Sequence, residues 1–145
     1  MEYKHVGRLI KTLTNSFEKE FNKVALKHDL TTSQSMVLIY LQKNKDKEIS
    51  PIDIEKHFNY SHASILGILK RLKEKNFITI KQSNKDKRYR IIEISDKGNN
   101  IEKEIKKSLK IVIKKLYLNI SNEEIDTFIN VLNKMIYNLQ EENLC

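Results

Sequence analysis

The chain has 145 residues, which suffices for one domain with a hydrophobic core and falls short of two ordinary independent domains. Three glycines and one proline are few, a composition that disfavours an all-β sandwich and favours long helices. The formal net charge of +8 suits a polyanionic partner, and the single cysteine, Cys145, excludes an intrachain disulfide.

Two helices are predicted at the start of the chain. Apolar residues recur every three or four positions over residues 6–24, which predicts a helix with one buried face that runs to about His28. Thr31 and Gln34 then form a capping box, in which a hydroxyl and an amide satisfy the first free amides of a helix. The body of this second helix is expected over residues 35–43.

A further pair of helices follows a short polar stretch. Ser50 as the N-cap and Pro51 at the first helical position predict a brief third helix that ends near Phe58. Ser61 is placed to cap a fourth helix, and Asn76 tolerates the left-handed conformation that often ends one. The predicted inward face of this fourth helix consists of Ile65, Ile68, Leu69 and Leu72.

The apolar period then changes from 3.6 to 2. Residues 77–81 and 89–94 have the alternation of two β-branched strands, and the segment that joins them, residues 82–88, is polar and charged. A β-hairpin is the simplest account of this region.

The rest of the chain predicts two more helices. Ser95 can cap a long helix with an apolar stripe over residues 101–116. Ser121 and Glu124 form a capping box for a last helix, whose stripe covers residues 125–139. The expected fold class is therefore mainly α with a small β-hairpin (α+β).

Positive charge is concentrated in the fourth helix and the hairpin. Residues 70–90 hold nine basic residues against two acids, whereas residues 121–145 carry one lysine against five acids. Such asymmetry indicates a localised anion site. A membrane surface would instead require a basic amphipathic helix with exposed bulky apolar residues, so double-stranded DNA is the expected partner, with no membrane. The chain also lacks the apolar run of a membrane span or a signal peptide, and we expect a cytoplasmic location.

The hairpin and the elements around it resemble MarR-type transcriptional regulators. Asp86, Lys87 and Arg88, followed by an apolar strand, Ser95 and Gly98, are similar to the wing of that family. Residues elsewhere also fall where the family has similar ones, namely Ile65, Leu69, Arg71, Leu72, Phe77 and Ile78. The order of elements matches over about residues 6–139.

The resemblance implies a single MarR-like domain over residues 1–145, with a winged helix-turn-helix lobe that binds DNA over about residues 30–98. Residues 1–29 and 99–145 would supply the helices of a homodimer. It further implies a sequence-specific repressor, which in many relatives is released by a small aromatic effector. Leu66 and Gly67 depart from the polar residues that relatives often have in the recognition helix.

The first group of candidate DNA-binding residues lies at the start of the recognition helix, off its core face. This group consists of Ser61, His62, Ala63, Ser64, Leu66, Gly67 and Lys70. His62 and Ser64 are candidates for hydrogen bonds to bases or phosphates, and Gly67 for a close approach of the DNA. Alternatives stay open: Ser61 and Ser64 only cap the helix, and Gly67 is a concession to packing.

The second group lies in the hairpin and consists of Lys85, Asp86, Lys87, Arg88 and Arg90. Arg88 is expected at the wing tip, where a guanidinium can enter a narrow minor groove and read its shape. Asp86 would orient Arg88 through an ion pair, and the other three would hold phosphates. The alternative is a solvated charged hairpin.

Other classes of function compete with this interpretation. An enzyme is disfavoured because the sequence has no Gly-rich phosphate loop, no clustered His/Cys ligand set and no nucleophile elbow, so no cofactor and no metal are expected. A helical protein-interaction module or antirepressor with the same fold stays open. The aromatic residues Phe17, Phe21, Tyr40 and Tyr117 are candidates for an effector cavity, although such residues are more often plain core.

Overall fold

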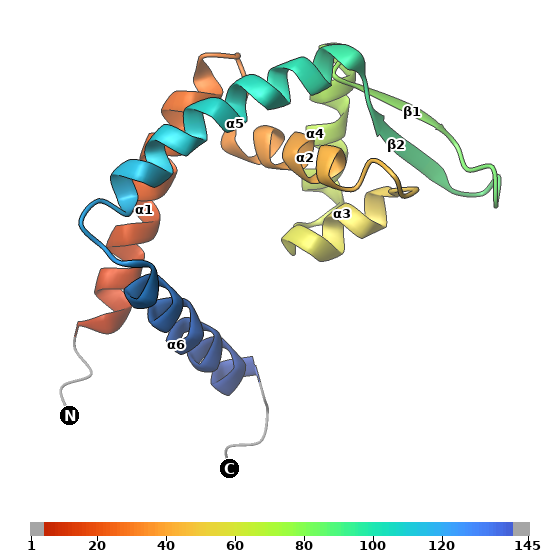
Figure 1. Cartoon of the computed structure of the whole chain (residues 1–145). Coiled ribbons are helices and arrows are strands. Elements are labelled where there is room, and N and C mark those ends of the chain that lie inside the picture. The colour runs from red at the N-terminus through yellow and green to blue at the C-terminus, as the bar shows by residue number, and fades with distance from the viewer. Residues whose placement is uncertain (1–4, 141–145) are drawn as a thin grey trace. The chain divides into compact units, whose positions relative to one another are not determined.

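Helices and strands follow one another in the predicted order. The computed structural model describes residues 5–140, so Cys145 lies outside the described residues (Figure 1). The described elements are α1 (Val6–Leu26), α2 (Thr32–Lys43), α3 (Pro51–Phe58), α4 (His62–Glu74), β1 (Ile78–Gln82), β2 (Arg90–Ile94), α5 (Asp96–Leu116) and α6 (Asn122–Gln140). The predicted fold class, mainly α with a small β-hairpin, is confirmed.

The chain divides into two compact units. One extends to Lys110 and contains α1 to α4, the hairpin and most of α5, and the other starts at Ile111 and contains the end of α5 and α6. The predicted functional division, a DNA-binding lobe flanked by dimerisation helices, stays a prediction. Over residues 5–140, no helix is long and apolar enough to cross a membrane.

The hydrophobic core of the first unit is built from the predicted apolar faces. Ile65 and Leu72 of α4 are fully buried, as are Leu38 of α2 and Ile54 of α3. Each such side chain contributes about 1.5–3 kcal/mol by leaving water. Ile68, predicted on the same inward face, is only half-buried, because it lies at the edge of the stripe that Ile65 and Leu72 define.

Two helix starts are fixed by reciprocal hydrogen bonds. Thr31 accepts the amide of Gln34 on its side-chain oxygen, and the Gln34 side chain accepts the amide of Thr31, at 3.2 and 3.1 Å. Ser50 and Asp53 form a second capping box, with Oδ2 of Asp53 accepting the Ser50 amide at 2.8 Å. These local bonds orient α2 and α3, which lie behind the predicted recognition helix.

The hairpin is antiparallel, with Ile78 opposite Ile94 and Gln82 opposite Arg90. Each strand begins one residue later than predicted. Phe77 instead belongs to the turn that follows α4, because its amide donates to the carbonyl of Leu72. The amide of Tyr89 closes the hairpin loop by donating to the carbonyl of Asp86. The hairpin is also tied to the body of the unit, since the Ile92 amide donates to the carbonyl of Ile49 at 2.8 Å.

A tight junction joins α4, the hairpin and α5. Asn76 has φ 60°, the left-handed stop that was predicted for α4. The Ser95 hydroxyl donates to the Asn76 carbonyl at 2.6 Å and also accepts the Gly98 amide at 3.0 Å. A Cβ on Gly98 would lie 2.1 Å from the carbonyl oxygen of Phe77, so only glycine fits there. The base of the hairpin is therefore held in a fixed position next to α4.

Candidate nucleic-acid interface

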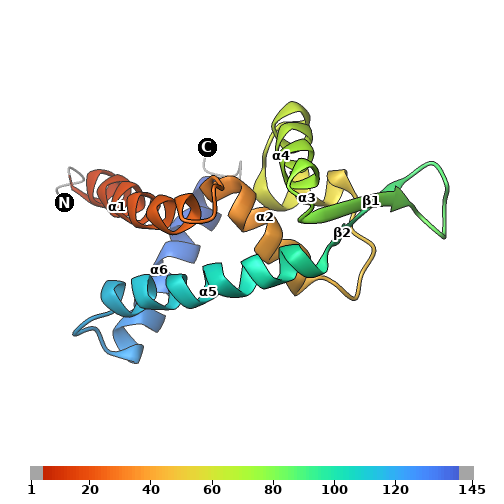
Figure 2. The same ribbon diagram turned by 90° about the horizontal axis from the view of Figure 1, so that it is seen from above.

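The outward side of α4 is the first part of the candidate interface. In Figure 2, α4 stands on the opposite side of α2 from α5, with one flank open to solvent. The side chains predicted to reach DNA from this helix are all exposed: Ser61, His62, Ala63, Ser64, Leu66, Gly67 and Lys70. The helix thus separates a buried face from an exposed face as the apolar spacing predicted.

The turn that connects α3 to α4 depends on one backbone carbonyl. Asn59 adopts φ 53°, and the carbonyl oxygen of Glu55 accepts the amides of both Asn59 and Tyr60. The sequence predicted that α3 ends near Phe58 and that Ser61 caps α4, but it did not predict this left-handed asparagine. Asn suits the position because its short polar side chain tolerates the left-handed region. The turn fixes where the first residues of α4 lie.

The hydroxyls at the start of α4 serve as caps. Ser61 Oγ accepts the amide of Ser64 at 3.2 Å and donates to the Ser64 hydroxyl at 2.8 Å. Both side chains are nevertheless exposed, so the capping role predicted as the alternative is present without removing either hydroxyl from the surface.

His62 is paired with a carboxylate that the sequence analysis did not single out. Its Nδ1 lies 2.5 Å from Oε1 of Glu55, on α3. The His62 side chain stays 66% exposed while that of Glu55 is 21% exposed, so the carboxylate is the more sheltered partner. Nothing in the local sequence marks this pair, because its members lie on two helices separated by the turn.

Gly67 opens onto free space. A Cβ built at this position meets no heavy atom within 4 Å, and the residue lies on the exposed flank of α4. Packing against the described residues of this chain therefore does not explain the glycine, and a close approach of DNA stays a prediction. Glycine inside a helix costs about 1 kcal/mol relative to alanine.

The hairpin loop is the second part of the candidate interface. The loop projects away from the helices in both views (Figures 1 and 2). Arg88 forms a two-pronged pair with Asp86: Nη2 lies 2.8 Å from Oδ2, and Nε lies 3.1 Å from Oδ1. Hydrogen bonds from the Arg88 side chain and amide lower the pKa of Asp86, and the Asp86 carboxylate raises the pKa of Arg88. The ion pair that the sequence predicted is present.

A buried serine shapes this loop. Ser83 is 5% exposed, and its hydroxyl accepts the amides of Lys85 and Asp86 at 3.1 and 3.3 Å. The same hydroxyl donates to Oε2 of Glu48 at 3.0 Å. The sequence predicted only a polar connection over residues 82–88 and did not indicate this anchor, although a serine that bonds nearby amides is typical of turns.

Part of the positive charge between residues 70 and 90 is neutralised within the chain. Lys75 pairs with Asp29 at 3.0 Å and Lys81 pairs with Glu93 at 2.6 Å. The cations of this segment without an ion-pair partner among residues 5–140 are Lys70, Lys73, Lys85, Lys87 and Arg90. The free charge thus lies on α4 and at the hairpin, which are adjoining elements.

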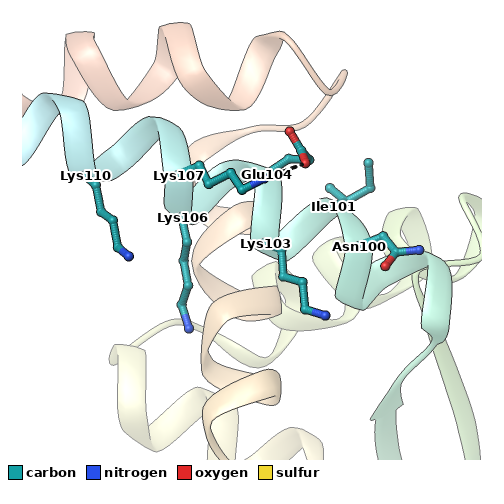
Figure 3. Close-up of a pocket in the computed structure, with 7 residues that line it drawn as sticks. All are labelled: Asn100, Ile101, Lys103, Glu104, Lys106, Lys107 and Lys110. Atoms are coloured by element: carbon teal, nitrogen blue, oxygen red, sulfur yellow. Dashed lines mark ion pairs between the residues drawn. The ribbon is translucent and has the colours of Figure 1, made fainter.

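A second basic surface lies on α5, where the sequence analysis proposed none. Figure 3 shows Lys103, Lys106 and Lys110 pointing the same way from this helix, beside an open pocket of about 470 Å³. Lys106 pairs with the buried Glu102 at 2.7 Å, and Lys107 lies 3.7 Å from Glu104. Lysines spaced three and four residues apart were visible in the sequence, but the stronger charge cluster lay elsewhere.

The aromatic candidates for an effector cavity lie in different surroundings. The rings of Phe17 and Phe21 pair within α1, at a centroid separation of 6.2 Å. The ring of Tyr40 instead lies 4.3 Å from that of His57 and 5.7 Å from that of Phe58. Burial raises the pKa of Tyr40, and the nearby Asp53 carboxylate adds to this effect. These contacts do not test whether an effector binds, so the effector stays a prediction.

Comparisons with known proteins agree that the chain is similar to transcriptional regulators. An uncharacterised HTH-type transcriptional regulator of Bacillus subtilis, YdgJ, is 29% identical over 92 residues, which are 63% of this chain and 56% of that regulator. The chain thus spans little more than half the length of this curated relative.

Solved structures resemble the whole fold. The transcription regulator MarR of Oenococcus oeni has 29% identity and a TM-score of 0.76, with 91% of this chain and 98% of that one covered. Staphylococcus aureus MepR, solved in a complex with DNA, has 18% identity and a TM-score of 0.87, with 97% and 100% covered. The second likeness shows the fold alone, a winged helix of the MarR type.

The family model with the description "Transcriptional regulator SarA/Rot" matches residues 19–105. This segment runs from within α1, through the helix-turn-helix and hairpin, into α5. It makes up more than half of the chain and includes every candidate DNA-binding residue. The chain belongs to the SarA/Rot family of transcriptional regulators.

Proposed function

We propose that this regulator binds specific double-stranded DNA sequences as a homodimer, with α4 in the major groove and the hairpin against an adjacent minor groove. The observation that carries the proposal is the Arg88 guanidinium, which Asp86 holds on the projecting loop of a hairpin whose strand β1 adjoins α4. A helix of this kind enters a major groove, and arginine is attracted to narrow minor grooves.

In this proposal the charged residues of the hairpin position the protein on DNA, and α4 reads the sequence. Lys85, Lys87 and Arg90 hold phosphates, which sets the register of the protein on the duplex. Asp86 does not touch DNA, since its carboxylate would be repelled by phosphates; it holds the Arg88 side chain in place. Base edges are read from the first turns of α4, where Gly67 leaves room for close approach.

The homodimer rests on apolar surface that a single chain leaves exposed. α6 has 19 residues and none of them is buried. Its exposed apolar side chains include Phe128, Ile129 and Ile136, and α1 exposes Val6, Leu9, Ile10 and Leu13 on one face. Unpartnered apolar stripes of this extent mark a protein contact.

Repression would follow from occupancy of the operator, and a small aromatic effector would act by favouring a state that DNA does not bind. The proposal includes no enzymatic activity. A regulator of this kind works where the chromosome lies, which in the bacteria of its relatives is the cytoplasm.

The test is an electrophoretic mobility assay on fragments of the source genome at increasing salt. The wild-type protein is expected to retain some fragments at a salt concentration that releases the rest. Arg88→Ala should weaken binding by about 1–3 kcal/mol, the scale of one good groove contact. Lys19→Ala, which removes a charge from an exposed site on α1, is the matched control and should bind nearly as well as the wild type.

Two results would count against the proposal. A wild-type protein that shifts no fragment at any salt would favour the antirepressor, which uses this fold without DNA. Equal loss of affinity in Arg88→Ala and Lys19→Ala would reject the wing assignment, because only non-specific charge would then matter.

A further inference from the structure

The pair of His62 and Glu55 joins the start of the recognition helix to the helix behind it. Nδ1 of His62 lies 2.5 Å from Oε1 of Glu55. An ionised carboxylate can only accept hydrogen bonds, so the proton of this contact belongs to Nδ1. A neutral imidazole carries one proton, and Nε2 is then left with a free lone pair.

Within the described part of the chain, the two partners form an ion pair only with each other. Among residues 5–140, His62 and Glu55 have no further ion pair, and Tyr60, the titratable residue in the turn, lies 3.4 Å from the Ser33 hydroxyl instead. The neighbours of His62 on α4, Ala63 and Ser64, are uncharged. The side of the imidazole that bears Nδ1 is thus occupied from α3.

The two side chains of the pair differ in exposure: Glu55 is largely sheltered, and His62 faces solvent. His62 is the first residue of α4 and its side chain is 66% exposed, whereas that of Glu55 is 21% exposed. The first residues of a recognition helix are the ones that meet base edges. Glu55 makes two separate contacts here. Its backbone carbonyl accepts the amides of the turn, and its side-chain carboxylate contacts the imidazole of His62.

We propose that Glu55 is a positioning residue for base recognition: it accepts the Nδ1 proton of His62 and so leaves Nε2 of the neutral imidazole to face the major groove as a hydrogen-bond acceptor. In that groove the exocyclic amines of adenine and cytosine are the donors, while guanine and thymine offer oxygen acceptors. His62 therefore selects an amino base at one position of the operator. This inference rests on the proposed function, because it requires that α4 reads DNA.

The test compares base preferences at pH 8. Binding sites are first selected from a random DNA pool with the wild-type protein and with His62→Ala, which identifies the operator position that depends on His62. The wild type is expected to prefer adenine or cytosine there. Glu55→Ala should reduce that preference about two- to tenfold, the range of one hydrogen bond.

Glu74→Ala is the matched control. It removes the same charge from an exposed residue of α4 and should leave the base preference at this position unchanged. The double variant of Glu55 and His62 should lose no more preference than His62→Ala alone, because both changes act through the same atom. Additive losses would overturn the proposal.

A spectroscopic readout separates positioning from a general loss of fold. The imidazole ¹⁵N shifts of His62 at pH 8 should show the proton on Nδ1 in the wild-type protein and on Nε2, or shared, in Glu55→Ala. A wild-type His62 protonated on Nε2 would overturn the inference, as would a preference for guanine or thymine.

The two proposals fail in different ways. If the wild-type protein selects no sequence from the pool, the proposed function fails. If it selects a sequence and Glu55→Ala selects the same one with equal preference, the function stands and the role of Glu55 is wrong.

Discussion

Two glycines in helices lie in opposite surroundings. Gly98 in α5 is buried, and a Cβ added there would collide with the Phe77 carbonyl. A Cβ added at Gly67 in α4 would meet no heavy atom within 4 Å. We therefore expect Gly67→Ala to stabilise the folded protein by up to about 1 kcal/mol, because alanine has the higher helix propensity. The same change should weaken DNA binding, since the added methyl occupies space that the duplex approaches. Urea unfolding and DNA titration measure the two effects separately.

Gly98→Ala is the control for this experiment, with the opposite sign. The collision with backbone atoms should destabilise the protein by about 1–3 kcal/mol, as overpacking does elsewhere. A Gly67→Ala protein that is more stable and binds DNA as well as the wild type would show that DNA does not use the open space at Gly67.

The wing is an element whose geometry depends on one ionised carboxylate. Arg88 lowers the pKa of Asp86 in the folded protein, mainly through side-chain hydrogen bonds. A carboxyl with a lowered folded pKa favours the folded loop fully above its unfolded pKa, and this contribution is lost as the pH falls through the lowered value. Because the pair is exposed and screened, the effect concerns the loop and not global stability.

We therefore expect Arg88→Ala to raise the pH at which Asp86 takes up its proton. The measurement is an NMR titration of the Asp86 carboxyl carbon in wild type and variant. Identical midpoints in the two proteins would show that the pair does not persist in solution.

The elements whose starts were predicted well are those with local signals. The Thr31–Gln34 and Ser121–Glu124 boxes join residues three apart, so the sequence alone contains both partners. In the second box, hydrogen bonds from Ser121 lower the pKa of Glu124. The starts of both strands were wrong by one residue, because Phe77 and Tyr89 make hydrogen bonds with the preceding helix and turn. The spacing of apolar residues along the sequence does not show which backbone amides bond to a neighbouring helix or turn.

The candidate site was predictable to the same extent. The exposed flank of α4 follows from the apolar face opposite to it, and the Asp86–Arg88 pair follows from its spacing in a turn. Glu55 was missed because its bond to His62 crosses from one helix to the next. Ser83 was missed because its hydroxyl donates to Glu48, which lies far away in the sequence. Contacts of this kind need the tertiary fold.

At the scale of the whole molecule, the proposed homodimer would cover the apolar surface of α6, none of whose residues is buried in the single chain. Several side chains of its apolar stripe are about half exposed to solvent, with Ile136 at 50%. In a monomer, a lysine at this position would change stability little, since the side chain already faces water. In a homodimer the same lysine would be buried without a partner charge, which is strongly unfavourable.

Ile136→Lys consequently distinguishes the two states. We expect the wild-type protein to sediment as a dimer and its melting temperature to rise with protein concentration, because association stabilises the folded form by mass action. Ile136→Lys should sediment as a monomer, with a melting temperature that no longer depends on concentration. Asn130→Lys, which adds the same charge on the opposite flank of α6, is the control and should remain dimeric. A wild-type protein that stays monomeric at every concentration would contradict the dimer, and so would an Ile136→Lys variant that sediments like the wild type.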